Sequence, residues 1–167
     1  MASNILVHAP AGAVPYAVEL ARAAGSDLGL VLTAIEFAQE KVSGGRVEED
    51  RDYAGTVFQT FDEPIFIGSA IAQLAGHADA VVVDSIEDWS VRLQRRFPDD
   101  PVELEAEVSS LTSVMKAGMS RLILVVRDSG PAPALTKKVL ATLDPFTQCV
   151  VDVRGGAPKV VRGALPR

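Results

Sequence analysis

Four polar residues stand where an α/β protein would bind a phosphate or a metal ion. Each lies at or just after the end of an aliphatic run: His8, Thr33, Asp84 and Arg127. Open α/β sheets bind ligands in the crevice at the carboxyl ends of their parallel strands. In that crevice a carboxylate such as Asp84 would hold a metal, and a guanidinium such as Arg127 would hold a phosphate. The His8 imidazole would carry a proton or accept a nucleotidyl group.

The same residues also have a purely structural interpretation. Asp84 or Ser85 would cap the helix that follows, with Asp88 in its first turn. His8 would be a hydrogen-bonded packing residue at a strand end. The sequence leaves both interpretations open. In the functional interpretation, Asp84 is a metal ligand.

The turn after the first aliphatic run lacks the groups that grip phosphate. A P-loop ends in Gly-Lys-Ser or Gly-Lys-Thr, so that its backbone N–H groups and its lysine neutralise phosphate charge. Residues 9–14 read Ala-Pro-Ala-Gly-Ala-Val here. Gly12 is the one glycine that a phosphate could approach, and a single glycine makes a poor anion nest. A simple tight turn is the competing interpretation.

Aliphatic runs that predict strands alternate with helical patterns. The runs are Ile5–Val7, Leu28–Leu32, Ala80–Val83, Leu122–Val126, Cys149–Val153 and Val160–Val161. Helices are expected over residues 15–24, 64–76, 102–119 and 134–143. The alternation predicts right-handed crossovers and a mostly parallel sheet. Gly155-Gly156 predicts a hairpin to an antiparallel C-terminal edge strand, and residues 40–51 predict a mobile loop or an irregular helix.

Two charged clusters offer further chemistry. Arg92, Arg95 and Arg96 lie at helical spacing i, i+3 and i+4, so one helix face would present three guanidiniums. They would bind a phosphate or a carboxylate, pair with Asp99 or Asp100, or pair with glutamates of a neighbouring subunit. The acidic run over residues 48–50 would bind a divalent ion or form a solvated loop.

Composition limits the class of protein. The chain has 167 residues, which suits a single α/β domain over residues 1–167. Its net charge of −6 argues against nucleic acid as the main partner. Its one cysteine excludes an intramolecular disulfide, and with two histidines it leaves no Cys/His zinc site. We expect a cytoplasmic protein without a membrane partner, because no apolar stretch approaches a membrane span and the N-terminus lacks a basic signal region.

Several motifs follow one another in an order that one enzyme family shares. A strand ends in Thr33, a helix starts after Glu63-Pro64, and an aliphatic strand ends in Asp84 with Trp89 and Leu93 in register after it. In these features the chain resembles the bifunctional adenosylcobinamide kinase/adenosylcobinamide-phosphate guanylyltransferases of cobalamin assembly. The resemblance extends over most of the chain.

The chain departs from this family at the positions that carry chemistry. The family's loop lysine and serine, which hold nucleotide phosphates and magnesium, are absent. The family histidine that becomes guanylylated falls on Asp50, and a carboxylate cannot form the same phosphoramidate. His8 and Asp50 are the catalytic candidates that remain, with Gly12, Thr33, Asp84 and Arg127 as candidates for cofactor binding. Fold-bearing positions match and chemistry-bearing positions are replaced, as in a pseudoenzyme.

The resemblance implies a three-layer α/β fold with P-loop NTPase (RecA-like) topology, GTP or ATP with magnesium as cofactor, and a homo-oligomer, since the family forms trimers. The first hypothesis is a pseudoenzyme that binds a nucleotide or a corrinoid weakly, or that acts as a structural or regulatory partner. The second is an active kinase/guanylyltransferase whose phosphate-binding cations are relocated, for example to Arg127 or Lys137. The third drops the resemblance for a flavodoxin-like small-ligand binding module.

Overall fold

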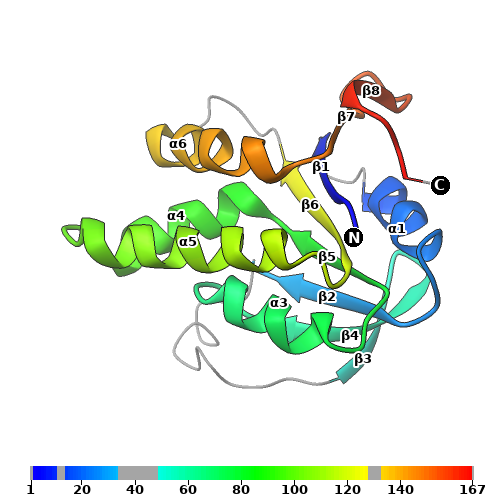
Figure 1. The fold of residues 1–167 in the computed structure, drawn as a ribbon, viewed down its shortest axis with the longest axis horizontal. Helices are drawn as coiled ribbons and strands as arrows, with labels where there is room; N and C mark the ends of the chain where they lie inside the picture. The colour runs from blue at the N-terminus through cyan, green and yellow to red at the C-terminus, as the bar shows by residue number, and fades with distance from the viewer. Residues whose placement is uncertain (1, 11–13, 34–48, 128–132, 167) are drawn as a thin grey trace.

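The computed structural model describes residues 2–10, 14–33, 49–127 and 133–166 (Figure 1). Its strands form one eight-stranded sheet in the order β3-β4-β2-β5-β6-β1-β7-β8. They are β1 (Asn4–Ala9), β2 (Leu28–Leu32), β3 (Glu49–Tyr53), β4 (Thr56–Asp62), β5 (Ala80–Asp84), β6 (Arg121–Arg127), β7 (Cys149–Asp152) and β8 (Lys159–Gly163). The six inner strands are parallel, and the edge strands β3 and β8 are antiparallel to their neighbours.

Helices cover both faces of this sheet. They are α1 (Val14–Arg22), α3 (Ile67–Ala75), α4 (Ile86–Arg96), α5 (Pro101–Ala117) and α6 (Ala134–Leu143), followed by the short 3-10 helix η1 (Asp144–Phe146). Buried residues of α1 pack with one set of strand side chains, and those of α3, α4, α5 and α6 pack with the other set. The fold is therefore a three-layer α/β arrangement. None of the helices in the described ranges is long and apolar enough to cross a membrane.

The central strands are continuous aliphatic runs because both of their faces are covered. All five residues of β5 are buried. Val81 and Val83 lie in the core beneath α3 to α6, whereas Ala80 and Val82 lie in the core beneath α1. This double burial is what places the end of β5, with its terminal Asp84, inside the molecule rather than on its surface.

The predicted strands and the C-terminal hairpin are confirmed. The prediction of a loop or an irregular helix over residues 40–51 is wrong where the structure describes this segment. Residues 49–51 belong to strand β3 and not to a loop or an irregular helix, whereas residues 40–48 lie outside the described ranges. Ala54 and Gly55 have φ angles of 50° and 84°, and they join β3 to β4 as a two-residue turn. Positive φ at both central residues gives a tight turn the twist that a hairpin needs.

Helix α3 begins later than the pattern predicts. Its expected start was Pro64, but the Glu63 carboxylate accepts hydrogen bonds from the backbone N–H groups of Ile65 and Phe66, at 3.1 and 3.2 Å. These bonds satisfy donors that a helix start would otherwise leave without partners. Helix α3 begins at Ile67 because Phe66 before it, with φ −91° and ψ 56°, lies outside the helical region.

The position of β1 distinguishes this sheet from a flavodoxin-like sheet. Flavodoxin-like order places the first strand between the second and the third. Here β1 lies between β6 and β7, and β6 separates it from β5. The flavodoxin-like expectation is therefore wrong for the fold.

Candidate functional site

Three of the predicted residues meet at the carboxyl ends of neighbouring strands. Thr33 follows β2, Asp84 ends β5 and Arg127 ends β6. Thr33 is fully buried, and its hydroxyl accepts a hydrogen bond from the Ser85 N–H at 2.8 Å. The same hydroxyl lies 3.1 Å from the Asp84 carbonyl and 3.0 Å from the Ser85 carbonyl, across a cis peptide bond. Thr33 thus fixes the backbone that carries Asp84.

Asp84 forms a two-point ion pair with Arg127. The Arg127 Nε donates to Asp84 Oδ1 at 2.7 Å, and its Nη2 donates to Oδ2 at 2.5 Å. The Tyr53 hydroxyl also donates to Oδ2. The Asp84 side chain is 5% exposed and that of Arg127 is 33% exposed. Both carboxylate oxygens therefore accept hydrogen bonds from side chains of the same protein. The two parallel bonds from Arg127 form the bidentate geometry in which arginine binds a carboxylate most strongly.

The charges of this cluster are stabilised in their present form. The hydrogen bonds to Asp84 raise the pKa of Arg127 above its usual value. Burial raises the pKa of the Tyr53 hydroxyl, and the negative charge of Asp84 is the second largest cause of this rise. Arg127 therefore stays charged and Tyr53 stays a hydrogen-bond donor, and a metal ion could reach Asp84 only by displacing them.

Tyr53 is a residue of this site that the sequence did not reveal. It comes from the edge strand β3, and β4 and β2 lie between that strand and β5. Its ring packs edge-on against Phe58, with centroids 5.8 Å apart and planes at 90°. The contact with Asp84 depends on how the β3–β4 hairpin folds across the face that α1 covers, and no local motif indicates it.

Glu87 is a second residue that the sequence reasoning missed. It lies in the first turn of α4, and its Oε2 accepts the backbone N–H of Arg127 at 2.5 Å. Its Oε1 is buried and makes no hydrogen bond within the described part of the chain. Burial raises the pKa of Glu87 to about 7, although its hydrogen bonds oppose that rise. The signal in the sequence that could have identified Glu87 is an acidic residue three positions after the end of β5.

His8 lies on the far side of Arg127 from Asp84. It is in β1, opposite Val126 of β6 and Asp152 of β7. Asp152 pairs with Arg154, whose Nη2 lies 2.6 Å from its Oδ2. Arg154 lowers the pKa of Asp152 to about 2, and His8 makes a smaller contribution in the same direction. His8 therefore belongs to the same edge of the sheet, one strand beyond the ion pair.

The other two predicted residues, Asp50 and Gly12, lie partly or wholly outside the described residues. Asp50 is in β3, opposite Gln59, and its side chain lies outside the described residues. Four strands separate β3 from β1, so the two catalytic candidates, Asp50 and His8, are not adjacent in the sheet. Gly12 lies outside the described residues altogether.

The carboxylates at this edge are engaged within the chain. Glu63 accepts two backbone N–H groups, Asp84 pairs with Arg127, Glu87 accepts a backbone N–H and Asp152 pairs with Arg154. Among the described residues, no group of three or more His, Cys, Asp or Glu side chains is arranged to hold a metal ion. The edge has the composition of a ligand site, but Asp84 and Asp152 are each paired with an arginine of the same chain.

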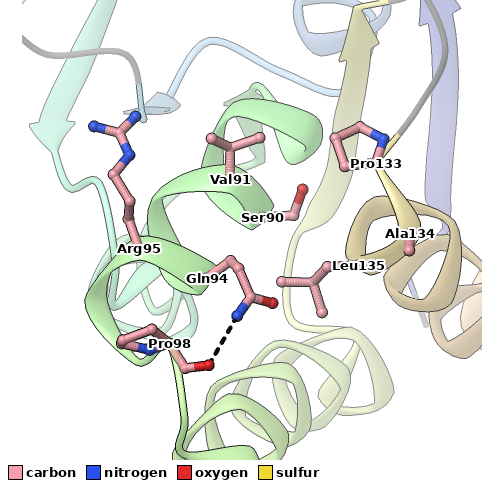
Figure 2. Close-up of a pocket in the computed structure, with 8 residues that line it drawn as sticks. All are labelled: Ser90, Val91, Gln94, Arg95, Pro98, Pro133, Ala134 and Leu135. Atoms are coloured by element: carbon pink, nitrogen blue, oxygen red, sulfur yellow. Dashed lines mark hydrogen bonds between the residues drawn. The ribbon is translucent and has the colours of Figure 1, made fainter.

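A hollow in the described part of the structure lies between α4 and α6 (Figure 2). It has a volume of about 560 Å³, and neither Asp84 nor Arg127 lines it.

No protein-family model matches the sequence, and no curated protein is similar to it. The function has to be inferred from the residues and their geometry.

Proposed function

We propose that this chain is a non-catalytic relative of the bifunctional adenosylcobinamide kinase/guanylyltransferases, in which an internal ion pair fills the metal position. The observation that carries the proposal is the occupation of Asp84 by Arg127 and Tyr53. Such a protein would act as a structural or regulatory partner, or would bind a nucleotide or a corrinoid weakly.

The strand order supports the RecA-like part of this proposal. In that topology one strand separates the strand before the phosphate-binding loop from the strand that ends in the metal-binding aspartate. Strand β6 separates β1 from β5 in the same way. A phosphate on the turn after β1 and a metal on Asp84 would meet over the end of β6, where Arg127 stands.

The electrostatics support the loss of catalysis. Phosphoryl transfer depends on cations that neutralise the charge developing on the transferred group, including a P-loop lysine and magnesium. The sequence has no such lysine in residues 9–14. Magnesium usually takes one or two carboxylates together with phosphate oxygens, and Asp84 offers a carboxylate that two donors already bind.

An active enzyme is the second candidate, and the position of Arg127 is the observation that favours it. If magnesium displaced Arg127 from Asp84, the freed guanidinium would stand beside a phosphate held after β1. The Arg127 side chain is one-third exposed, so solvent already reaches part of it. This candidate requires that nucleotide and magnesium bind together strongly enough to break the ion pair.

Titration calorimetry with GTP and ATP, with and without magnesium, separates the two candidates. We expect no magnesium-dependent heat at nucleotide concentrations up to about 1 mM, which corresponds to less than about 4 kcal/mol of binding free energy. Asp152→Ala is the matched control, because Asp152 is also an ion-paired carboxylate at the same edge. Micromolar binding that requires magnesium, and that Asp84→Ala removes but Asp152→Ala retains, would establish the active enzyme. An assay of adenosylcobinamide phosphorylation would then follow.

A further inference from the structure

Helices α4, α5 and α6 extend past the carboxyl ends of the strands (Figure 1). The sheet therefore leaves the outer part of each helix uncovered. In α5 the buried residues are Leu111, Thr112 and Met115, all in its second half. The first half of α5 and the turn before it form the free end of the molecule.

The hollow between α4 and α6 opens at this free end. Its apolar lining includes Val91, Pro98 and Leu135 (Figure 2). A second hollow of about 390 Å³, between α5 and α6, shares Leu135 with it. We call the two together the α6 groove. Its Gln94 amide donates to the Pro98 carbonyl at 3.3 Å, so this polar group is satisfied within the wall.

The α4 side of this groove carries an unneutralised positive charge. Arg92 pairs with Asp88 at 2.8 Å, but Arg95, one turn later, makes no ion pair within the described ranges. The N-terminus of α6, with Pro133 at its cap, has no capping side chain and adds a partial positive charge. No carboxylate lines the α4–α6 hollow. The α4–α6 hollow therefore suits an apolar segment that carries negative charge, whereas Glu105 and Lys138 line the second hollow.

The start of α5 has the opposite character. Val102 is 72% exposed, and Glu103 beside it is exposed. Glu103 and Glu107 are one turn apart on the helix, and no described cation pairs with either. Burial is the largest cause of a raised pKa at Glu107, and the negative charges of Glu103 and Glu63 raise it further. This acidic turn with an exposed valine complements the apolar wall of the α4–α6 hollow and the charge of Arg95.

We propose that the α4–α6 hollow of the α6 groove binds the start of α5 from a second copy of this chain. Val102 contacts the apolar wall, and Glu103 pairs with Arg95 of the other copy. Both surfaces lie at the same free end of the molecule, on either side of the α4–α5 turn. A two-fold axis beside that turn lets each copy give and receive the same contact, as isologous dimers do. This inference does not depend on the proposed function.

Sedimentation velocity with charge-swapped variants tests the proposal. We expect the wild type to dimerise at concentrations up to about 100 µM, and Arg95→Glu or Glu103→Arg alone to weaken dimerisation at least about tenfold. An equimolar mixture of the two variants restores it, because each contact again joins a glutamate to an arginine. Circular dichroism confirms that both variants are folded.

Two matched charge changes serve as controls. Lys159→Glu on β8 and Glu19→Arg on α1 alter exposed residues away from the free end, and neither should change dimerisation. A wild type that stays monomeric over this range, or that forms the trimer implied by the resemblance, overturns the proposal. So does a dimer that both variants leave intact, or a mixture in which association is not restored.

Discussion

The carboxyl edge of the sheet and the α6 groove differ in how their charges are balanced. At the edge, the 5% exposed Asp84 has both oxygens bound by Arg127 and Tyr53. At the groove, the exposed Arg95 has no partner within the described part of the chain, and most of the other lining side chains are apolar. The ion pair at the edge is satisfied within the chain, whereas the groove is mostly apolar and carries the unpaired charge of Arg95.

This difference shows that the position of a ligand site in a fold does not determine its present use. Parallel sheets offer the ends of their strands as binding sites, and this chain fills that place with its own side chains. The surface whose groups lack partners is instead the α6 groove, on the helical layer. An exposed apolar surface of this kind is a candidate for contact with another protein. Changes at the edge should therefore affect folding, and changes in the groove should affect association.

Replacing Asp84 should have the largest effect on stability. Asp84→Ala leaves the Arg127 guanidinium without its partner in a partly buried place, and breaking such a pair costs about 2 to 3 kcal/mol of unfolding free energy. Urea denaturation measures this loss. Asp152→Ala is the comparison, since Arg154 is 55% exposed and an exposed pair contributes much less to stability. Equal losses in the two variants would contradict the assigned difference.

A double-mutant cycle measures the edge ion pair directly. Arg127→Met and Asp84→Asn each remove one charge while they keep much of the side-chain volume. Their combined effect should differ from the sum of the single effects by about 1 to 2 kcal/mol, because the two groups contact each other at two points. Additive effects would mean that the pair contributes little beyond packing.

Glu87 should make stability depend on pH. Its pKa is about 7 in the folded protein, against an ordinary value of 4.5. The folded state thus holds the proton more tightly, so this contribution to stability is complete below about pH 4.5 and is lost as the pH rises through 7. Glu87→Gln removes this loss. Its advantage over the wild type should grow by on the order of 1 kcal/mol between pH 5 and pH 8, and a constant difference would refute the assignment.

The smallest effect on folding is expected in the groove. Arg95→Glu changes an exposed side chain without an internal partner, so it should alter the unfolding free energy by less than about 0.5 kcal/mol. Denaturation at a protein concentration too low for dimers isolates this term. A loss comparable to that of Asp84→Ala would mean that Arg95 supports the fold and not an interface.

The sequence predicted which residues come together at the site better than it predicted the interactions that these residues make. Aliphatic runs located β2, β5 and β6, and parallel pairing then required Thr33, Asp84 and Arg127 to converge. The partner of Asp84 could not be predicted, because an arginine at a strand end can face a ligand or a neighbouring carboxylate. Tyr53 was missed with its hairpin, since the Ala54-Gly55 turn lacks the Asn-Gly or Asp-Gly signature of such turns.

Electron paramagnetic resonance of Mn²⁺ with GTP most directly tests whether Asp84 is closed to metal ions. Mn²⁺ substitutes for magnesium, and its spectrum changes when a protein carboxylate enters its coordination. We predict that adding the protein leaves the Mn²⁺–GTP spectrum unchanged. A protein-dependent change in the spectrum that Asp84→Asn abolishes, and that Asp152→Asn does not, would contradict the account.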